Sequence, residues 1–262
     1  MISVDAALVH VFDLVTPLPT EIVPLRHAAG RVLAKPVVAK RSQPPFRASV
    51  MDGYAVRDAD LPGPLTVIGE AAAGHGFDGT ISQGQTLRIF TGAPMPEGAD
   101  RVIIQEDVAR DGDQIRLNEG ADTKIYVREI GADFKVGATL AAPRRLTPAD
   151  VALIAAMNVA EVTVARRPRV ALLATGDELV MPGETPSPDQ IIASNTFGLA
   201  AMFEAEGAIA HVLPIARDTE TSLEAALSLT KGSDLLVTIG GASVGDHDLV
   251  GKVAMNKGMD RS

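Results

Sequence analysis

The sequence predicts a multi-domain protein in which a β-rich segment is inserted into an N-terminal helical and β region, and an α/β domain with a mostly parallel sheet follows. Short β-branched runs alternate with Gly, Pro and Asp over residues 44–145, which is typical of strands joined by turns. Apolar runs alternate with helical patterns from Arg169 onward, as in a parallel sheet with crossover helices. A basic linker, "RRPR", separates the two patterns.

The N-terminal region is expected to begin with a helix. Ser3 is a favourable cap, and Leu8, Phe12 and Val15 follow at the spacing of an amphipathic packing helix. The stretch "PLRHAAGRVLAKPVVA" predicts a short helix that ends near Gly30 and then a strand.

A helix and a strand are expected to lead into the linker. Thr147 is a suitable cap with Pro148 at the first helical position, and the helix should end near Asn158. The stretch "AEVTVA" predicts the strand.

The α/β region has a regular order of elements. Strands are predicted at "RVALLATG", "AHVLPIA" and "SDLLVTIGG". A helix capped by Ser194 or Asn195 and stopped by Gly207 follows the first strand, and a helix capped by Asp218 follows the second. Because these strands lack polar alternation and are separated by helices, the sheet should be parallel.

The composition limits the class of protein. Hydrophobic residues make up 46% of the 262 residues and aromatic residues only 3%, which predicts an ordered, aliphatic core. The formal net charge of −9 argues against nucleic-acid binding. The absence of cysteine excludes disulfides, thiolate metal sites and a cysteine nucleophile, and fits a reducing cytosol. The N-terminal stretch "MISVDAALVH" has an early Asp and no basic leader, so it is not expected to be a signal peptide, and no apolar run is long enough to span a bilayer.

Two predicted strands of the α/β region end on glycine and acidic residues, the position at which open parallel sheets bind ligands. Glycine lets backbone N–H groups approach a phosphate, and neighbouring carboxylates would repel that phosphate unless a hard cation such as Mg²⁺ intervened. Helix capping is the structural alternative, but two acidic turns in one sheet favour a site. The residues concerned are Gly176, Asp177, Glu178, Gly240, Gly241, Ser243, Asp246 and Asp248.

For three other acids, a structural role is enough to explain why an acid occurs at that position. Asp52 followed by Gly53 is a strong signal for a tight turn of the kind that joins hairpin strands. Asp133 lies in a predicted turn, and Asp218 can cap a helix.

Six motifs nevertheless occur in the order and spacing of one known family. They are "ASVMDGYAVRDAD", "FTGAPMPEGADRVIIQED", "GADFKVGATL", "TGDELVMPGE", "ASNTFGLAAMFEAEGA" and "DLLVTIGGASVGDHDLV". Over nearly the whole chain, to about Val250, the sequence therefore resembles the MoeA family, the molybdopterin molybdenumtransferases of molybdenum cofactor biosynthesis, to which the E domain of gephyrin is related.

The resemblance implies a domain organisation and an activity. Residues 1–43 and 146–168 would form a linker and dimerisation domain, residues 44–145 an inserted β-rich domain, and residues 169–262 a molybdopterin-binding α/β domain like that of the MogA adenylyltransferases. The protein would be a cytoplasmic homodimer that inserts molybdate into adenylylated molybdopterin and releases AMP with the help of Mg²⁺. A MogA-type adenylyltransferase would be its pathway partner, and neither nucleic acid nor membrane would bind it.

The matched motifs also assign roles to residues. The acids expected to be catalytic are Asp52, Asp133, Glu178, Asp218 and Asp248. Of these, Mg²⁺ ligands are expected to be Asp52, Glu178 and Asp248. The residues expected to bind the pterin or nucleotide are Thr91, Gly240, Gly241, Ser243 and Gly245. Because the substrate, the adenylate and molybdate are all anions, charge neutralisation and positioning should supply most of the rate.

The chain differs from the family after "HDLV". The family continues with further strands and helices, a Pro-Gly-Lys-Pro loop and a small β domain, whereas this sequence reads "GKVAMNKGMDRS". The α/β domain is therefore expected to be truncated. Two other functions stay open: a non-catalytic module that binds molybdopterin or a protein partner, and a MogA-like adenylyltransferase that uses ATP. The region before the linker argues against the second, because that class needs only the sheet domain.

Overall fold

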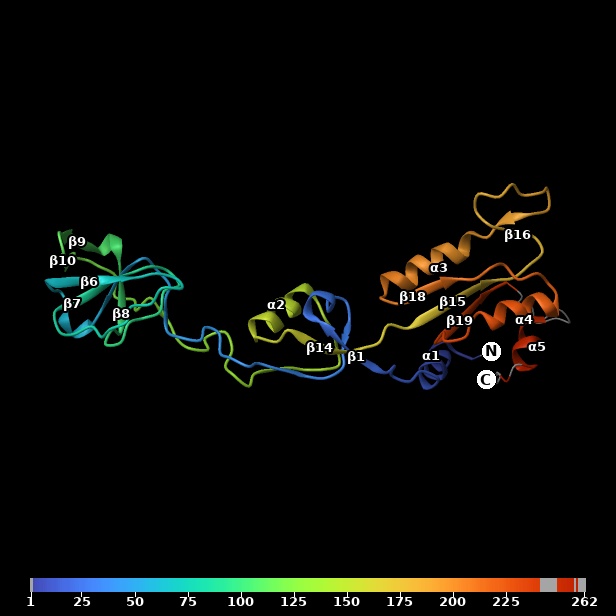
Figure 1. Cartoon of the computed structure of the whole chain (residues 1–262), viewed down its shortest axis with the longest axis horizontal. Coiled ribbons are helices and arrows are strands. Elements are labelled where there is room, and N and C mark those ends of the chain that lie inside the picture. The colour runs from blue at the N-terminus through green and yellow to red at the C-terminus, as the bar shows by residue number, and fades with distance from the viewer. Residues whose placement is uncertain (1, 241–248, 257, 259–262) are drawn as a thin grey trace. The chain divides into compact units, whose positions relative to one another are not determined.

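The computed structural model describes residues 2–240, 249–256 and 258 (Figure 1). The chain divides into two compact units. The first unit comprises Met1–Val23, Gly30–Ala34 and Thr163–Ser262, and the second comprises Pro24–Ala29 and Lys35–Val162. The division falls within strands β1 (Thr20–Pro24) and β14 (Glu161–Ala165). The predicted boundaries of three domains are finer than this division and stay a prediction.

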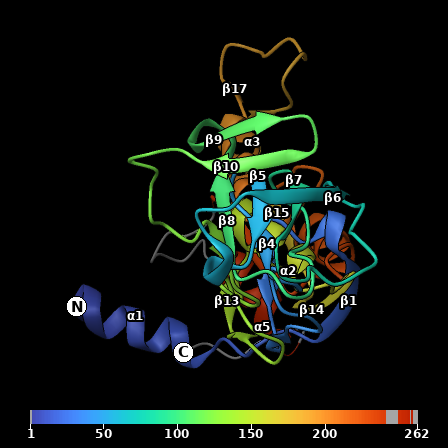
Figure 2. The same cartoon turned by 90° about the vertical axis from the view of Figure 1, so that its left-hand side faces the viewer.

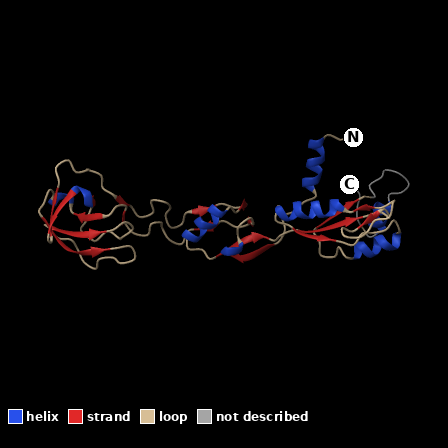
Figure 3. Cartoon of the chain, turned by 90° about the horizontal axis from the view of Figure 1, so that it is seen from above, coloured by secondary structure: helices blue, strands red, loops and turns tan. Residues whose placement is uncertain are grey.

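The second unit is rich in strands, as predicted for residues 44–145 (Figure 3). Its largest sheet has the order β8-β5-β7-β6-β10-β9, is antiparallel except between β6 and β7, and has β9 and β10 as its outer pair (Figure 2). Two smaller antiparallel pairs join β4 to β11 and β3 to β12. The elements are η1 (Leu25–His27), β3 (Val37–Val38), β4 (Ala48–Ser49), β5 (Gly53–Val56), η2 (Asp58–Asp60), β6 (Leu65–Ala71), β7 (Gln85–Ile89), β8 (Arg101–Ile104), η3 (Gln105–Asp107), β9 (Val108–Asp111), β10 (Gln114–Leu117), β11 (Val127–Arg128), β12 (Thr139–Leu140), β13 (Arg144–Arg145) and α2 (Pro148–Ala156).

Strand β5 is buried on both faces. Ala55 packs in one apolar cluster with Leu87 and Ile89, whereas Tyr54 and Val56 belong to a second cluster. Successive side chains of a strand point to opposite faces, so β5 contributes to both clusters. Tyr54 is the only aromatic side chain among the buried hydrophobic residues that the structure describes, in agreement with the predicted aliphatic core.

The first unit contains the predicted parallel sheet, with the order β18-β15-β19. Helix α3 covers one face of this sheet, and α4 and α5 cover the other (Figure 1). A short parallel pair, β16 with β17, and helix α5 were not predicted. The elements are α1 (Val4–Asp13), β2 (Val32–Leu33), β15 (Arg169–Ala174), β16 (Leu179–Val180), β17 (Ile191–Ile192), α3 (Ser194–Ala205), β18 (Ile209–Val212), α4 (Glu220–Ser228), β19 (Leu235–Ile239) and α5 (Leu249–Asn256).

Two helix caps are as predicted and two are wrong. Ser3 caps α1, and Thr147 forms a capping box at α2. Helix α3 begins at Ser194 without a side-chain cap, so the cap predicted there is wrong. Helix α4 is capped by Thr219 and not by Asp218, because Thr219 has the extended backbone of a cap and its hydroxyl accepts the backbone N–H of Ser222.

Helix α1 makes none of the apolar packing predicted for it, because no residue of it is buried. Leu8 is 47% exposed and Phe12 is 70% exposed. The helix itself is confirmed, but within the described residues its apolar face meets no core. No helix in the described ranges combines the length and the apolar character needed to cross a bilayer.

Asp234, next to strand β19, binds Arg166 of the basic linker and Arg169 at the start of strand β15. Its carboxylate accepts hydrogen bonds from the Arg166 guanidinium at 2.6 and 2.9 Å and from the Arg169 backbone N–H at 2.7 Å. These donors, with Arg166 first, lower the pKa of Asp234 to about 2. Because this folded pKa lies below the ordinary value of 3.8, Asp234 stabilises the fold above pH 3.8 and loses that effect as the pH falls toward 2.

We therefore expect Asp234→Asn to lower the free energy of unfolding by about 1–2 kcal/mol near pH 6, and by much less near pH 2.5. Urea unfolding of wild type and variant at a series of pH values measures the difference. The matched control is Asp189→Asn, which changes an exposed loop carboxylate of the same unit. An equal loss of stability at both ends of the pH range would contradict the assignment.

Candidate functional site

The carboxylate of Asp52 is exposed and is held by Thr91. Its Oδ1 accepts hydrogen bonds from the Thr91 backbone N–H and from the Thr91 hydroxyl, both at 2.8 Å. These two bonds, the backbone bond first, and the nearby charge of Arg88 lower the pKa of Asp52, while partial desolvation opposes the shift. Two predicted site residues are thus in direct contact, and the carboxylate is ionised at neutral pH.

Asp52 and Gly53 do not form the hairpin turn that the sequence predicts. Strand β4 ends at Ser49 and pairs with β11, whereas β5 begins at Gly53 and pairs with β7 and β8. Glycine is needed for another reason: a Cβ at position 53 would lie 1.8 Å from the carbonyl oxygen of Ile103. The missing side chain lets β5 and β8 approach each other, and this contact places the neighbouring Asp52.

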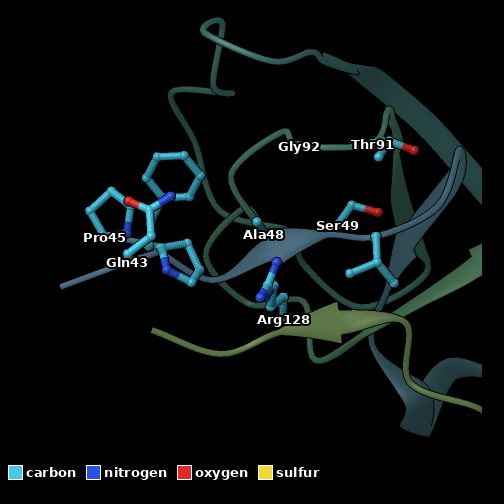
Figure 4. A pocket seen from close by; sticks show the side chains of 10 residues that line it. Gln43, Pro45, Ala48, Ser49, Thr91, Gly92 and Arg128 are labelled. Atoms are coloured by element: carbon cyan, nitrogen blue, oxygen red, sulfur yellow. The ribbon is translucent and has the colours of Figure 1, made fainter. Parts of the chain in front are cut away.

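A cavity of about 450 Å³ opens beside Thr91 (Figure 4). Strand β4 runs along it, with Thr91 on one side of the strand and Arg128 on the other (Figure 4). Mostly apolar walls with a few polar groups are typical of small-molecule sites. The cavity is lined by Gln43, Pro44, Pro45, Phe46, Ala48, Ser49, Val50, Thr91, Gly92 and Arg128.

Arg128 connects a second predicted acid to this cavity. Its guanidinium forms an ion pair with Asp133, which lies in the turn region between β11 and β12 as expected. Asp52 and Asp133 are therefore each bonded to a residue that lines the same cavity. Arg128 was not among the predicted site residues, because a single arginine on a short strand forms no recognisable motif.

In the first unit, the predicted acids Glu178 and Asp218 lie on neighbouring loops. An isolated bridge joins Thr175 to Ala216 just before these loops, and the Asp218 backbone N–H donates to Asp177 Oδ1 at 3.3 Å. The three carboxylates are exposed. The structure thus brings the acidic turn after β15 together with Asp218 at one end of the parallel sheet. The second acidic turn of the strand-end argument, with Asp246 and Asp248, lies outside the described residues, so that argument stays a prediction.

Arg217 organises these acidic loops and was also missed. Its guanidinium donates to the carbonyl oxygens of Asp177 and Leu179, both at 3.0 Å. Gly176 allows the tight packing there, since a Cβ would lie 2.2 Å from Glu178 Oε2. The cation next to Asp218 is visible in the sequence, but its contact with the loop after β15 depends on the sheet order.

Gly240 lies at the end of β19 with a φ of +99°, where a Cβ would lie 2.6 Å from the Thr175 carbonyl oxygen. The Thr175 hydroxyl is buried and has no hydrogen-bond partner among the described residues. Glycine is therefore needed for the close approach of β19 to Thr175, and the Thr175 hydroxyl is a polar group without a partner at this strand end. The other predicted residues of this loop lie outside the described residues: Gly241, Ser243, Gly245 and Asp248.

The part of the chain that the structure describes contains no cluster of three or more metal-ligating side chains. Both bonds from Thr91 reach Oδ1 of Asp52, so Oδ2 keeps its lone pairs for a cation. Mg²⁺ is usually bound by one or two carboxylates together with substrate phosphates and water. Asp52 therefore fits one ligand position of such a site.

Family models cover most of the chain. Residues 2–158 match the MoeA N-terminal region, domains I and II, and residues 171–261 match a probable molybdopterin-binding domain. The chain belongs to the MoeA family. Both the resemblance seen in the motifs and the predicted fold class are confirmed.

Relatives of this MoeA-family chain are longer than it is. It is 38% identical over 261 residues to a molybdopterin molybdenumtransferase of Nostoc sp., covering 95% of this chain and 60% of the relative. It is 36% identical over 254 residues to a molybdopterin molybdenumtransferase of Haemophilus influenzae, and this match covers 95% of this chain and 63% of the relative. A crystal structure of a molybdopterin biosynthesis MoeA protein from Pyrococcus horikoshii matches with a TM-score of 0.84 and 32% identity, covering 98% of this chain and 66% of that one.

Proposed function

We propose that this MoeA-family chain forms the substrate site of a molybdopterin molybdotransferase, which inserts molybdate into adenylylated molybdopterin and releases AMP. The main support is the ionised Asp52 carboxylate, which is bonded to Thr91 at a cavity that Arg128 also lines. The matched relatives are named molybdopterin molybdenumtransferases. The homodimer, the MogA-type partner and the cytoplasmic location stay predictions that rest on the family resemblance.

In the proposed site, the acidic and the basic residues have different roles. Thr91 holds Asp52 ionised and in one orientation, and Arg128 offers a cation to an oxyanion in the cavity. Glu178 and Asp218 supply negative charge at the end of the parallel sheet, next to the glycine strand end at Gly240 where a phosphate is proposed to bind.

Mg²⁺ is the proposed metal ion, with Asp52, Glu178 and Asp248 as its proposed ligands. When bound, it would neutralise the charge between the reacting oxyanions. Asp52 supports this assignment because one of its oxygens is engaged by Thr91 and the other is left for a cation.

Arg128 provides the test of the cavity. We expect Arg128→Met to raise the KM for adenylylated molybdopterin about tenfold or more with a smaller change in kcat, because a charged hydrogen bond to the bound anion is lost. Molybdate-dependent AMP release measures both constants. The control is Arg116→Met, which removes an exposed arginine of the same unit that does not line this cavity.

The same assay separates the proposed function from its alternatives. Molybdate-dependent release of AMP by wild type supports the transferase. Tight binding of adenylylated molybdopterin without turnover would indicate a binding module, and adenylation of molybdopterin from ATP would indicate a MogA-like enzyme. An unchanged KM in Arg128→Met would remove the cavity from the substrate site.

A further inference from the structure

Arg88 lies on β7 beside the Asp52 segment, and its guanidinium lies over two aromatic rings. Its Cζ is 5.0 Å from the centroid of the Tyr54 ring and 4.8 Å from that of Phe90. Tyr54 is its cross-strand neighbour on β5, and Phe90 follows on its own strand segment. A guanidinium over aromatic faces at these distances is attracted to both rings and held in one plane.

The stacked guanidinium binds the backbone around Asp52. One nitrogen donates to the carbonyl oxygen of Gly53 at 3.2 Å, and another donates to the side-chain oxygen of Gln105 at 2.5 Å. The backbone N–H of Gln105 in turn donates to the carbonyl oxygen of Asp52 at 3.1 Å. Arg88 therefore restrains the Gly53–Tyr54 peptide directly and the Asp52 carbonyl through Gln105.

Arg88 bonds the protein segments next to Asp52 and does not line the cavity where a ligand would bind. The lining of the cavity includes Thr91 but not Arg88. Thr91 lies three residues beyond Arg88 on the same segment, and its N–H and hydroxyl fix the Asp52 carboxylate. Arg88 on β7 and Thr91 in the turn just after β7 thus supply the support of the Asp52 backbone and the donors to its carboxylate.

We infer that Arg88 is the positioning residue of this site: it clamps the Asp52–Gly53 backbone so that the Asp52 carboxylate stays aligned with Thr91 at the cavity. The functional part of this inference rests on the proposed transferase. An arginine is required because the planar fork reaches two acceptors while the guanidinium lies over the Tyr54 and Phe90 rings, and the single ammonium of lysine cannot do both.

Backbone amide hydrogen exchange of the full chain tests the clamp without any substrate. In Arg88→Met we expect the amides of Gln105 and Thr91 to exchange about tenfold faster or more, because the bonds that close this segment are lost. Arg88→Lys should restore part of the protection, since it keeps a cation and one donor. Transferase measurements on the same variants should show a fall in kcat with little change in KM.

The matched control is Arg110→Met. Arg110 also contacts the Tyr54 side chain, through its hydroxyl at 3.5 Å, but it bonds otherwise to the Gly112 carbonyl oxygen and the Asp113 carboxylate. Unchanged exchange at Gln105 and Thr91 in Arg88→Met, or equal acceleration in Arg110→Met, would overturn the positioning role. Faster exchange in Arg88→Met together with an inactive wild-type chain would instead reject the transferase and leave the clamp supported.

Discussion

Asp52→Asn is expected to reduce molybdate-dependent AMP release by about 100-fold or more while leaving the fold intact. Asparagine keeps an oxygen that can accept both Thr91 bonds, so the local geometry is retained. What it loses is the negative charge, which the Thr91 donors and Arg88 stabilise in the wild type. A large effect on rate with a small effect on structure therefore follows from the charge alone.

The rate of AMP release and the thermal unfolding curve of the same preparation measure this prediction. The control is Asp100→Asn: Asp100 is also exposed, and its Oδ1 accepts the Asp58 backbone N–H at 2.8 Å in the same unit. It should keep wild-type activity. Wild-type rates in Asp52→Asn would show that the Asp52 charge has no part in the reaction.

Gly53→Ala should be among the most destabilising single-methyl changes in the chain, with a loss of about 3 kcal/mol or more in the free energy of unfolding. The new Cβ would lie 1.8 Å from the Ile103 carbonyl oxygen and 3.0 Å from the Ile104 Cα, and both are backbone atoms. Backbone on a paired strand cannot move aside without breaking the β5–β8 register, so the clash cannot be relieved cheaply.

Gly76→Ala is the control for this change. A Cβ at Gly76 would meet the Pro94 side chain at 3.6 Å, which is ordinary van der Waals contact in the same unit. Urea unfolding should show a change of less than about 1 kcal/mol for Gly76→Ala. Equal stability of the two variants would mean that β5 and β8 do not pair as closely as the structure has them.

Local signals in the sequence predicted the elements well. The helix that begins after Thr147 is confirmed, with Thr147 as its cap. It could be predicted because the cap, the proline and the helical spacing all lie within a few residues. The strands β15, β18 and β19 follow from apolar runs bounded by glycine and helix signals, and their parallel pairing is confirmed. The caps of α3 and α4 were wrong because neighbouring polar residues compete for one position, and backbone geometry decides between them.

The candidate site was only partly predictable. The acids came from motif matches, and the contact of Asp52 with Thr91 agrees with them. Arg128, Arg217 and Arg88 were missed, since each acts through contacts with segments distant in the sequence. A lone arginine has no periodicity or spacing that distinguishes a structural cation from a solvated one.

By itself, the sequence determined which segments become helices and strands and which acids follow them, because propensity, capping and hydrophobic spacing act over a few residues. Only the tertiary structure decided why Gly53 must be glycine and which cations meet those acids. Both answers depend on which strands lie side by side: β8 lies against β5 at Gly53, and β7 carries Arg88 to the Asp52 backbone. Strand pairing over long sequence separations is set by the packing of the whole unit, which no local pattern specifies.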